Sequence, residues 1–175
     1  IREIHLDTAS CTSVNLLRVL LDRSGCHPRF VPLADYASAP SLDNVLLIGN
    51  PAIDFRRTHG CTSELPGTTG HQWLDLGELW LAQEQLPFTY AAWVLRKNSP
   101  TALRRLLLDS AVQGLAALPS IVASRSEYDL SFRQSYLGGY IQYLMDAPAR
   151  DGIRRFAERL AALSERPVHP PRFVK

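Results

Sequence analysis

Apolar and polar residues alternate along Ile1–Leu6, as expected for a half-buried β-strand. An apolar pattern of helical period follows over residues 14–21, and Gly25 is its predicted end. Two further apolar runs, at residues 29–33 and 44–48, predict strands. The order strand, helix, strand, strand predicts a βαβ core with a mainly parallel sheet.

The next stretch of the chain predicts loops, one capped helix and a long strand. Residues 35–43 are rich in Pro, Ser and Asp and predict a loop, and residues 50–70, which contain several Pro and Gly, predict a surface excursion rather than core. A helix is predicted from a cap at Asp75 to about Gln85. The apolar segment 87–95, which carries Phe88, Tyr90 and Trp93, predicts a strand.

The remainder of the chain has helical periodicity, so the pattern divides the chain near residue 97. We predict an α/β lobe over residues 1–96 and a helical segment over residues 97–175. Pro119 and Pro148 are the predicted breaks between helices, which are expected at residues 101–117, 119–126, 131–145 and 149–163.

Composition is that of an ordinary globular protein and excludes few functions. The 175 residues are 46% hydrophobic and 21% charged, with a net charge of +2, which indicates neither nucleic acid nor an acidic surface as a partner. The three cysteines are widely spaced and odd in number, which favours a reducing compartment. No unbroken apolar run approaches the ~20 residues that cross a bilayer, so we expect no membrane partner.

Three hydroxyl groups lie at the predicted turn between the first strand and the first helix. Ser10, Thr12 and Ser13 stand beside helix amides that have no partner in the first turn, and such a turn can receive a carboxylate or a phosphate. Plain capping of the helix explains one of the three hydroxyls without any ligand. Both interpretations stay open from the residues alone.

A second candidate site follows the third predicted strand, at Gly49 and Asn50. Ligands of open α/β sheets bind beyond the carboxyl ends of the strands, which is where this turn is expected. An ordinary turn has the same composition, because Gly, Asn and Pro are typical turn residues.

Other chemical groups have simpler explanations. Asp75 and Glu78 have the spacing of a helix cap, and most of the aromatic side chains of residues 73–93 are expected in the core. The two glycines of Tyr136–Tyr140 are predicted to allow close packing of helices. No metal site is expected, since no two histidines are spaced i, i+4; they are His5, His27, His59, His71 and His169.

Taken in order, several segments make the chain resemble the menaquinone-pathway family that contains chorismate dehydratase. The matching segments span most of the chain; they are Leu6-Asp7, Ser10-Cys-Thr-Ser13, Leu17-Arg-Val-Leu20, Leu47-Ile-Gly-Asn-Pro-Ala52, Asp75-Leu-Gly-Glu78, Trp80, Leu86-Pro-Phe88, Ala92-Trp93, Tyr136-Leu137, Tyr143-Leu144 and Gly152-Ile153 with Phe156. The resemblance implies an α/β fold like that of type II periplasmic binding proteins, with a mainly parallel sheet and C-terminal helices.

Two features depart from the family pattern. Family members have Asp where this chain has Asn50, so one charge is absent. They also begin with a further segment that forms much of the other lobe, including a turn with an active-site Asn. That segment is not in this sequence, so we expect one lobe to be incomplete and helices 97–175 to complete and brace it.

The resemblance implies a cytoplasmic lyase that removes water from chorismate to give 3-[(1-carboxyvinyl)oxy]benzoate. Such an enzyme binds a small carboxylate substrate through Ser10, Thr12, Ser13, Gly49 and Asn50, and it requires no metal or redox cofactor. The catalytic base stays unassigned, and a homodimer stays open. Two alternatives also stay open: the related 1,4-dihydroxy-6-naphthoate synthase, and a non-catalytic binding protein for a small carboxylate.

Overall fold

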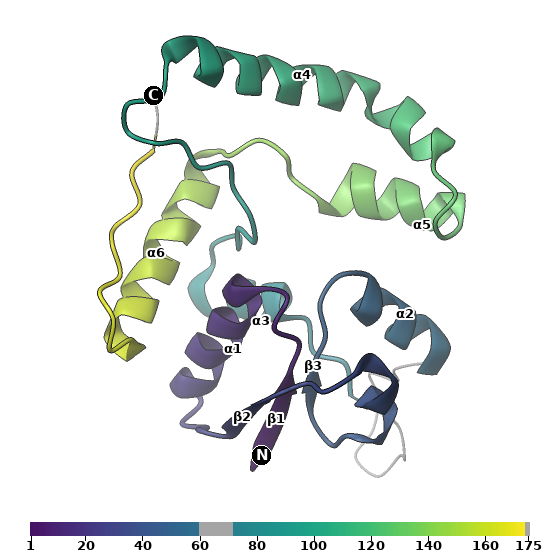
Figure 1. The fold of residues 1–175 in the computed structure, drawn as a ribbon, viewed down its shortest axis with the longest axis vertical. Helices are drawn as coiled ribbons and strands as arrows, with labels where there is room; N and C mark the ends of the chain where they lie inside the picture. Colours follow the sequence, from purple (N-terminus) through teal and green to yellow (C-terminus); the bar gives the residue numbers. More distant parts are fainter. Residues whose placement is uncertain (60–71, 174–175) are drawn as a thin grey trace. The chain divides into compact units, whose positions relative to one another are not determined.

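The computed structural model describes residues 1–59 and 72–173 (Figure 1). Contacts within the chain divide it into two compact units. Unit 1 comprises Ile1–Ala91 together with Pro148–Lys175, and unit 2 comprises Ala92–Ala147. The sequence-based lobes 1–96 and 97–175 stay a prediction, as does the completion of a second lobe by the latter.

Unit 1 contains a three-stranded parallel sheet in the order β2-β1-β3. The strands are β1 (Glu3–Leu6), β2 (Arg29–Pro32) and β3 (Val45–Leu46). The central strand β1 alternates half-buried and buried residues, and its inward-facing Ile4 and Leu6 are 5% exposed. The sequence prediction of an α/β core with parallel strands is therefore confirmed.

Helix α1 (Cys11–Arg23) connects β1 to β2 and has well-formed ends. Its N-cap is Ser10, whose side chain accepts a hydrogen bond from the Ser13 amide. At the other end, Gly25 has φ +65°, and its amide donates to the Asp22 carbonyl while the Cys26 amide donates to the Leu21 carbonyl. This pair of hydrogen bonds is a Schellman motif, which confirms Gly25 as the predicted end of the helix.

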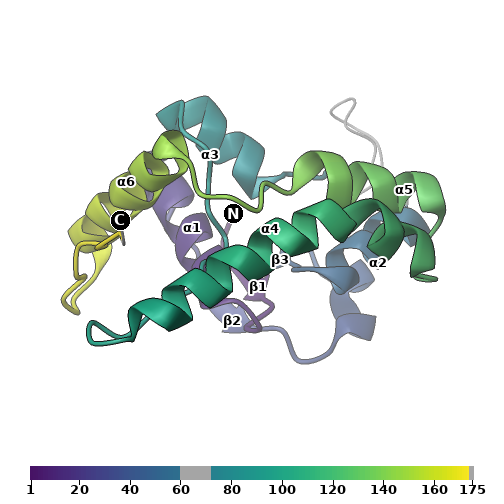
Figure 2. The same cartoon turned by 90° about the horizontal axis from the view of Figure 1, so that it is seen from above.

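The core of unit 1 joins helices that lie far apart in the sequence. Helices α1, α3 (Leu76–Glu84) and α6 (Ala147–Leu163) pack side by side, as both Figure 1 and Figure 2 show. Trp80 of α3 is fully buried, and its ring meets those of Phe88 and Phe156 edge-on at centroid distances of 5.4 and 6.0 Å. Edge-on aromatic pairs add to the stabilisation from burial, so these rings bind α6 to the rest of unit 1.

A very close backbone approach holds α6 in the same place. Gly152 is buried, and a Cβ atom added to it would lie 2.1 Å from the carbonyl oxygen of Pro87. Because no side chain fits at that separation, glycine is required for α6 to pack against the segment that follows α3.

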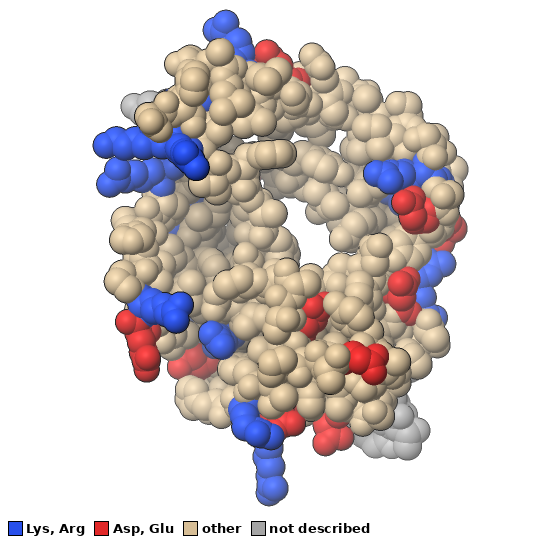
Figure 3. Space-filling model, viewed as in Figure 1, with Lys and Arg blue, Asp and Glu red and all other residues tan. Residues whose placement is uncertain are grey.

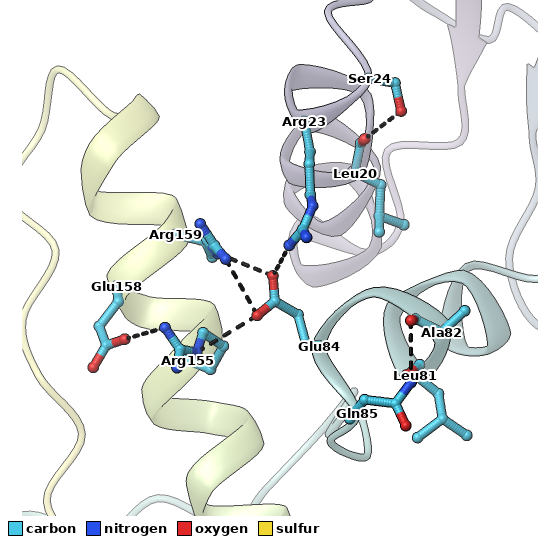
Figure 4. Close-up of polar contacts among 10 residues, drawn as sticks. All are labelled: Leu20, Arg23, Ser24, Leu81, Ala82, Glu84, Gln85, Arg155, Glu158 and Arg159. Carbon is cyan, nitrogen blue, oxygen red and sulfur yellow. Dashed lines mark hydrogen bonds and ion pairs between the residues drawn. The ribbon is translucent and has the colours of Figure 1, made fainter.

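An ion-pair cluster around Glu84 connects the ends of the same helices (Figure 4). The Glu84 side chain is 7% exposed, and its carboxylate pairs with Arg23 at 2.8 Å, Arg159 at 3.0 Å and Arg155 at 3.5 Å. These arginines come from α1 and α6, so one nearly buried carboxylate joins three helices. Arg155 also pairs with Glu158, at 3.3 Å.

Helices form in two segments where the sequence predicts none. Residues 50–59 form α2 (Asn50–His59), and none of its residues is buried, so the predicted surface position is confirmed for this part of the segment; residues 60–70 lie outside the described residues. Proline fits the first turn of a helix, where no amide donor is needed, and Pro51 occupies that position. Residues 35–43 include the 3-10 helix η1 (Tyr36–Ser41), which is capped by Asp35.

The predicted strand at residues 87–95 does not form within the described residues. A strand needs a neighbour to satisfy its amides and carbonyls, and the described sheet contains only β1, β2 and β3. The aromatic residues also divide: Trp80 is buried and Phe88 packs against the core, whereas Tyr90 is 47% exposed and Trp93 is 86% exposed.

Unit 2 is built on one long helix, α4 (Thr101–Ser124), so the predicted break at Pro119 is wrong. The helical φ of proline and the helix-forming residues around it let the helix continue at the loss of one amide donor. Contrary to the sequence-based expectation, α4 is long and apolar enough to span a membrane by length and composition, and only 6% of its most apolar stretch is buried. Core helices of water-soluble proteins pass the same test, so this is weak evidence of a membrane.

The helix predicted at residues 131–145 ends earlier than expected. It comprises α5 (Leu130–Ser135) and the π-helical turn η2 (Tyr136–Tyr140). Gly138 and Gly139 of that turn have open space where a Cβ would lie, so their predicted role in close helix packing is wrong. Helix α6 confirms the predicted helix at 149–163, although Pro148 lies in its first turn and is not a break before it.

We expect Gly152→Ala to lower the free energy of unfolding of unit 1 by at least about 2 kcal/mol, because the new methyl group overlaps the Pro87 carbonyl. Urea unfolding followed by tryptophan fluorescence measures this loss. Gly114→Ala is the matched control: it lies inside α4 with open space at its Cβ position, so alanine there should not destabilise. Equal midpoints for Gly152→Ala and the wild type would contradict the close approach.

We expect Glu84→Gln to destabilise unit 1 by about 1–2 kcal/mol, because three arginines lose their shared carboxylate. The loss stays below that of a fully buried pair, since the arginine side chains are 44–48% exposed and water screens them. Glu127→Gln is the control: its ion pair with Arg125 is 3.3 Å long and both side chains are more than half exposed, so it should change the same urea midpoint little. Similar shifts for both variants would refute a special role of Glu84.

Candidate anion-binding site at the carboxyl edge of the sheet

The two predicted site segments follow neighbouring parallel strands. β1 pairs directly with β3, with His5 opposite Val45 and Leu6 opposite Leu46. The carboxyl ends of two parallel strands lie at the same edge of a sheet, so the turn before α1 and the turn before α2 begin at that edge (Figure 1). The structure thus places both sequence-predicted segments at one edge of the sheet.

The three predicted hydroxyl groups of the first turn differ in their surroundings. Ser10 caps α1, since its Oγ accepts from the Ser13 amide at 3.1 Å. The Ser13 side chain is buried, and its Oγ lies 3.1 Å from that of Ser10. Thr12 is half-buried, and its hydroxyl has no hydrogen-bond partner among the described residues. Capping therefore accounts for Ser10 and Ser13, and Thr12 keeps its hydroxyl available.

Two amides at the start of α1 are also available. The Ser13 amide is bound by the cap and the Val14 amide donates to the Ser10 carbonyl, at 3.3 Å. The amides of Cys11 and Thr12 have no hydrogen-bond partner in the part of the chain that is described, as is usual for the first turn of a helix. Together with the partial positive charge of the helix end, they can bind an anion.

The second turn presents a similar helix start. Gly49 has φ +64°, a left-handed conformation that glycine adopts without steric cost. Its carbonyl accepts hydrogen bonds from the amides of Ala52 and Ile53, both at 3.1 Å, so Gly49 directs the chain into α2. Asn50 is the first residue of α2 and is exposed.

A buried carboxylate lies beside the first turn. Asp7 is 4% exposed; its Oδ1 accepts from the Ala9 amide at 2.9 Å, and its Oδ2 accepts from the Tyr36 hydroxyl at 3.1 Å. Although the Tyr36 ring is half exposed, desolvation of the hydroxyl and its hydrogen bond to Asp7 raise the pKa of Tyr36 above its usual value. The phenol therefore remains a donor to Asp7 at neutral and moderately alkaline pH.

An open hollow of about 380 Å³ lies next to this edge, between η1 and α2. It is lined by Tyr36, Ala37, Pro40, Leu47, Pro51, Asp54, Phe55, Thr58 and His59. None of the five predicted site residues is part of its lining, although Pro51 adjoins Asn50. The hollow is thus bounded by the first turn of α2, through Pro51, but not by the start of α1.

The remaining sequence-based candidates are explained by structure. Asp75 caps α3, accepting hydrogen bonds from the amides of Gly77 and Glu78, as its spacing predicts. No group of three His, Cys, Asp or Glu side chains suited to a metal occurs in residues 1–59 and 72–173. Cys11 and Cys26 are free thiols, and Cys61 lies outside the described residues.

Comparison with known proteins shows the family to which the chain belongs. A family model described as menaquinone biosynthesis matches residues 2–162, which is most of the chain. The chain belongs to this menaquinone biosynthesis family. The resemblance noted in the sequence is therefore confirmed.

One curated member of the family is similar over nearly the whole chain. Chorismate dehydratase from Thermus thermophilus is 32% identical over 169 residues. The match covers 90% of this chain and 62% of the relative, so the chain spans less than two thirds of the relative's length.

Sequence reasoning missed the role of Asp7 and the helix that begins at Asn50. Asp7 directly follows an alternating strand, where a buried side chain is hard to distinguish from the first polar residue of a loop. A signal for α2 was present, because Gly49-Asn50-Pro51 places proline at the first turn of a helix.

Two variants distinguish a hydroxyl that caps α1 from a hydroxyl that is available for a ligand. Ser10→Ala should lower the free energy of unfolding by about 1 kcal/mol, because the Ser13 amide loses its acceptor. Thr12→Ala should leave stability almost unchanged, since no described residue uses the Thr12 hydroxyl. Urea unfolding measures both values, and an equal loss in the two variants would show that Thr12 also has a structural role.

Proposed function

We propose that the protein is a carbon–oxygen lyase that dehydrates chorismate to 3-[(1-carboxyvinyl)oxy]benzoate in menaquinone biosynthesis. The observation that supports this most is the 32% identity to a chorismate dehydratase, together with the family match over residues 2–162. The proposed fold is the two-lobed fold of type II periplasmic binding proteins, of which the small parallel sheet would be part of one lobe.

The dehydration of chorismate requires few chemical groups from the protein. The departing ring proton of chorismate is vinylogous to the ring carboxylate and is therefore acidic, and formation of the aromatic ring drives the loss of water. One C–H bond and one C–OH bond of the ring break, and the products are the aromatic diacid and water. The protein must bind two carboxylates, orient the leaving hydroxyl and exclude bulk water.

The proposed receptor for a substrate carboxylate is the start of α1. Its unpaired amides at Cys11 and Thr12, and the Thr12 hydroxyl, are donors suited to a carboxylate. Ser10 and Ser13 shape the turn through their mutual contact, 3.1 Å between the two Oγ atoms. Gly49 and Asn50, at the same edge of the sheet, are proposed to contribute the second helix start and an amide side chain.

We further propose that activity requires a polypeptide segment equivalent to the part of the relative that this chain does not span. Unit 2 supports this, since Val122 is its one buried hydrophobic residue among those described. Trp93 and Val94 are 86% and 88% exposed, and α4 exposes further apolar side chains, among them Leu106 and Leu108. Figure 3 shows few charged side chains over α4, as expected for a surface that another segment covers.

The test uses the protein as its gene encodes it, incubated with chorismate. We expect loss of the diene absorption of chorismate with the release of one 3-[(1-carboxyvinyl)oxy]benzoate and one water per chorismate. Chromatography with mass detection identifies the product. Unchanged chorismate would refute the proposal. Saturable binding of chorismate without turnover would instead indicate a non-catalytic binding protein.

A further inference from the structure

The buried carboxylate of Asp7 has no part in the proposed contacts with substrate. Asp7 and Ser13 are the buried polar residues among those described; Asp7 lies in the connection between β1 and α1, and Ser13 lies in the first turn of α1. None of the described Arg or Lys side chains forms an ion pair with Asp7. A buried charge is costly unless hydrogen bonds satisfy it, so the donors that face Asp7 must be held in place.

Asp7 forms hydrogen bonds with three segments: β3, the turn before α1, and η1. Its amide donates to the Leu46 carbonyl of β3 at 3.0 Å. Its Oδ1 binds the Ala9 amide two residues on, which closes an Asx turn immediately before the cap Ser10. Its Oδ2 accepts from Tyr36 of η1, 29 residues further along the chain.

The carboxylate of Asp7 can hold the turn only if its plane is fixed. Each oxygen has one donor, so rotation of the carboxylate to suit Tyr36 would move the acceptor of the Ala9 amide. The Ala9 amide in turn sets the path of the chain into Ser10, whose φ of −128° and ψ of 108° direct the capping oxygen at the Ser13 amide. Tyr36 is thereby coupled to the amides at the start of α1.

We propose that Asp7, oriented by the Tyr36 hydroxyl, is a positioning residue that sets the first turn of α1 for a carboxylate ligand. This inference rests on the proposed function. Because both oxygens of Asp7 accept hydrogen bonds from the protein, its role is to orient the receptor and not to contact the substrate.

The first measurement reads the turn directly and does not depend on activity. In Tyr36→Phe, hydrogen exchange at the Ala9 and Ser13 amides, followed by NMR, should accelerate about tenfold, since one hydrogen bond to a charged group is lost. The Leu20 amide in the middle of α1 should keep its wild-type rate. Unchanged rates at Ala9 and Ser13 would overturn the inference whether or not chorismate is the substrate.

The second measurement is steady-state kinetics with chorismate on the protein as its gene encodes it. Tyr36→Phe should raise KM about tenfold with kcat within about twofold, as expected when only binding geometry is lost. Tyr143→Phe is the matched control: the Tyr143 hydroxyl donates to the Leu137 carbonyl at 2.9 Å, and the residue is 44% exposed, compared with 51% for Tyr36. The control should keep the wild-type KM.

Asp7→Asn separates positioning from charge. Asparagine keeps an acceptor for the Ala9 amide but presents an NH2 donor to the phenol, so the Tyr36 hydroxyl loses its charged acceptor and KM should rise as in Tyr36→Phe. A lower KM would show that Asp7 acts mainly by repelling the substrate anion, and would overturn the inference. A wild-type KM in Tyr36→Phe, with only the unfolding midpoint lowered, would reduce Asp7 and Tyr36 to a structural role and overturn it as well. If the wild type does not consume chorismate, only the proposed function is refuted. The hydrogen-exchange rates of the Ala9 and Ser13 amides then test the positioning role of Asp7.

Discussion

The parallel pairing of β1 with β3 is the constraint on which the proposed site depends. Leu6 lies opposite Leu46, so the chain leaves both strands at the same edge and enters a helix within a few residues each time. A shift in this register would move the start of α1 away from the start of α2. Since Ile4, Leu6 and Leu46 form one buried cluster, the apolar packing of the sheet keeps the two helix starts together.

A second constraint keeps unit 1 intact around the sheet. Helix α6 comes from the end of the chain, yet its Phe156 meets Trp80 and its Gly152 meets the Pro87 backbone. The ion pairs of Glu84 connect α3 with α1 and α6, so charged groups add to the contacts of the aromatic rings. Phe156 and Leu160 of α6 pack against the cluster that contains Leu16 of α1, so the helix that begins at the sheet edge is held by residues far away in the sequence.

Local signals predicted much of unit 1, because its elements are specified by nearby residues. Ser10 and Gly25 mark the ends of α1, Asp75 marks the start of α3, and the alternation in Ile1–Leu6 indicates β1. The segment 87–95 shows the limit of such signals: its apolar run is typical of a buried strand, but a strand also needs a pairing partner. The contacts of Asp7 with Tyr36 and of Gly152 with Pro87 were likewise beyond prediction, since each depends on the tertiary fold.

We propose that the unpaired amides at the start of α1 receive a substrate carboxylate. Amide NMR of the protein as its gene encodes it, during titration with 3-[(1-carboxyvinyl)oxy]benzoate, tests this most directly. We expect saturable chemical-shift changes at the Cys11 and Thr12 amides, with smaller changes near Asn50. Saturable shifts confined to other parts of the molecule, with Cys11 and Thr12 unmoved, would contradict it.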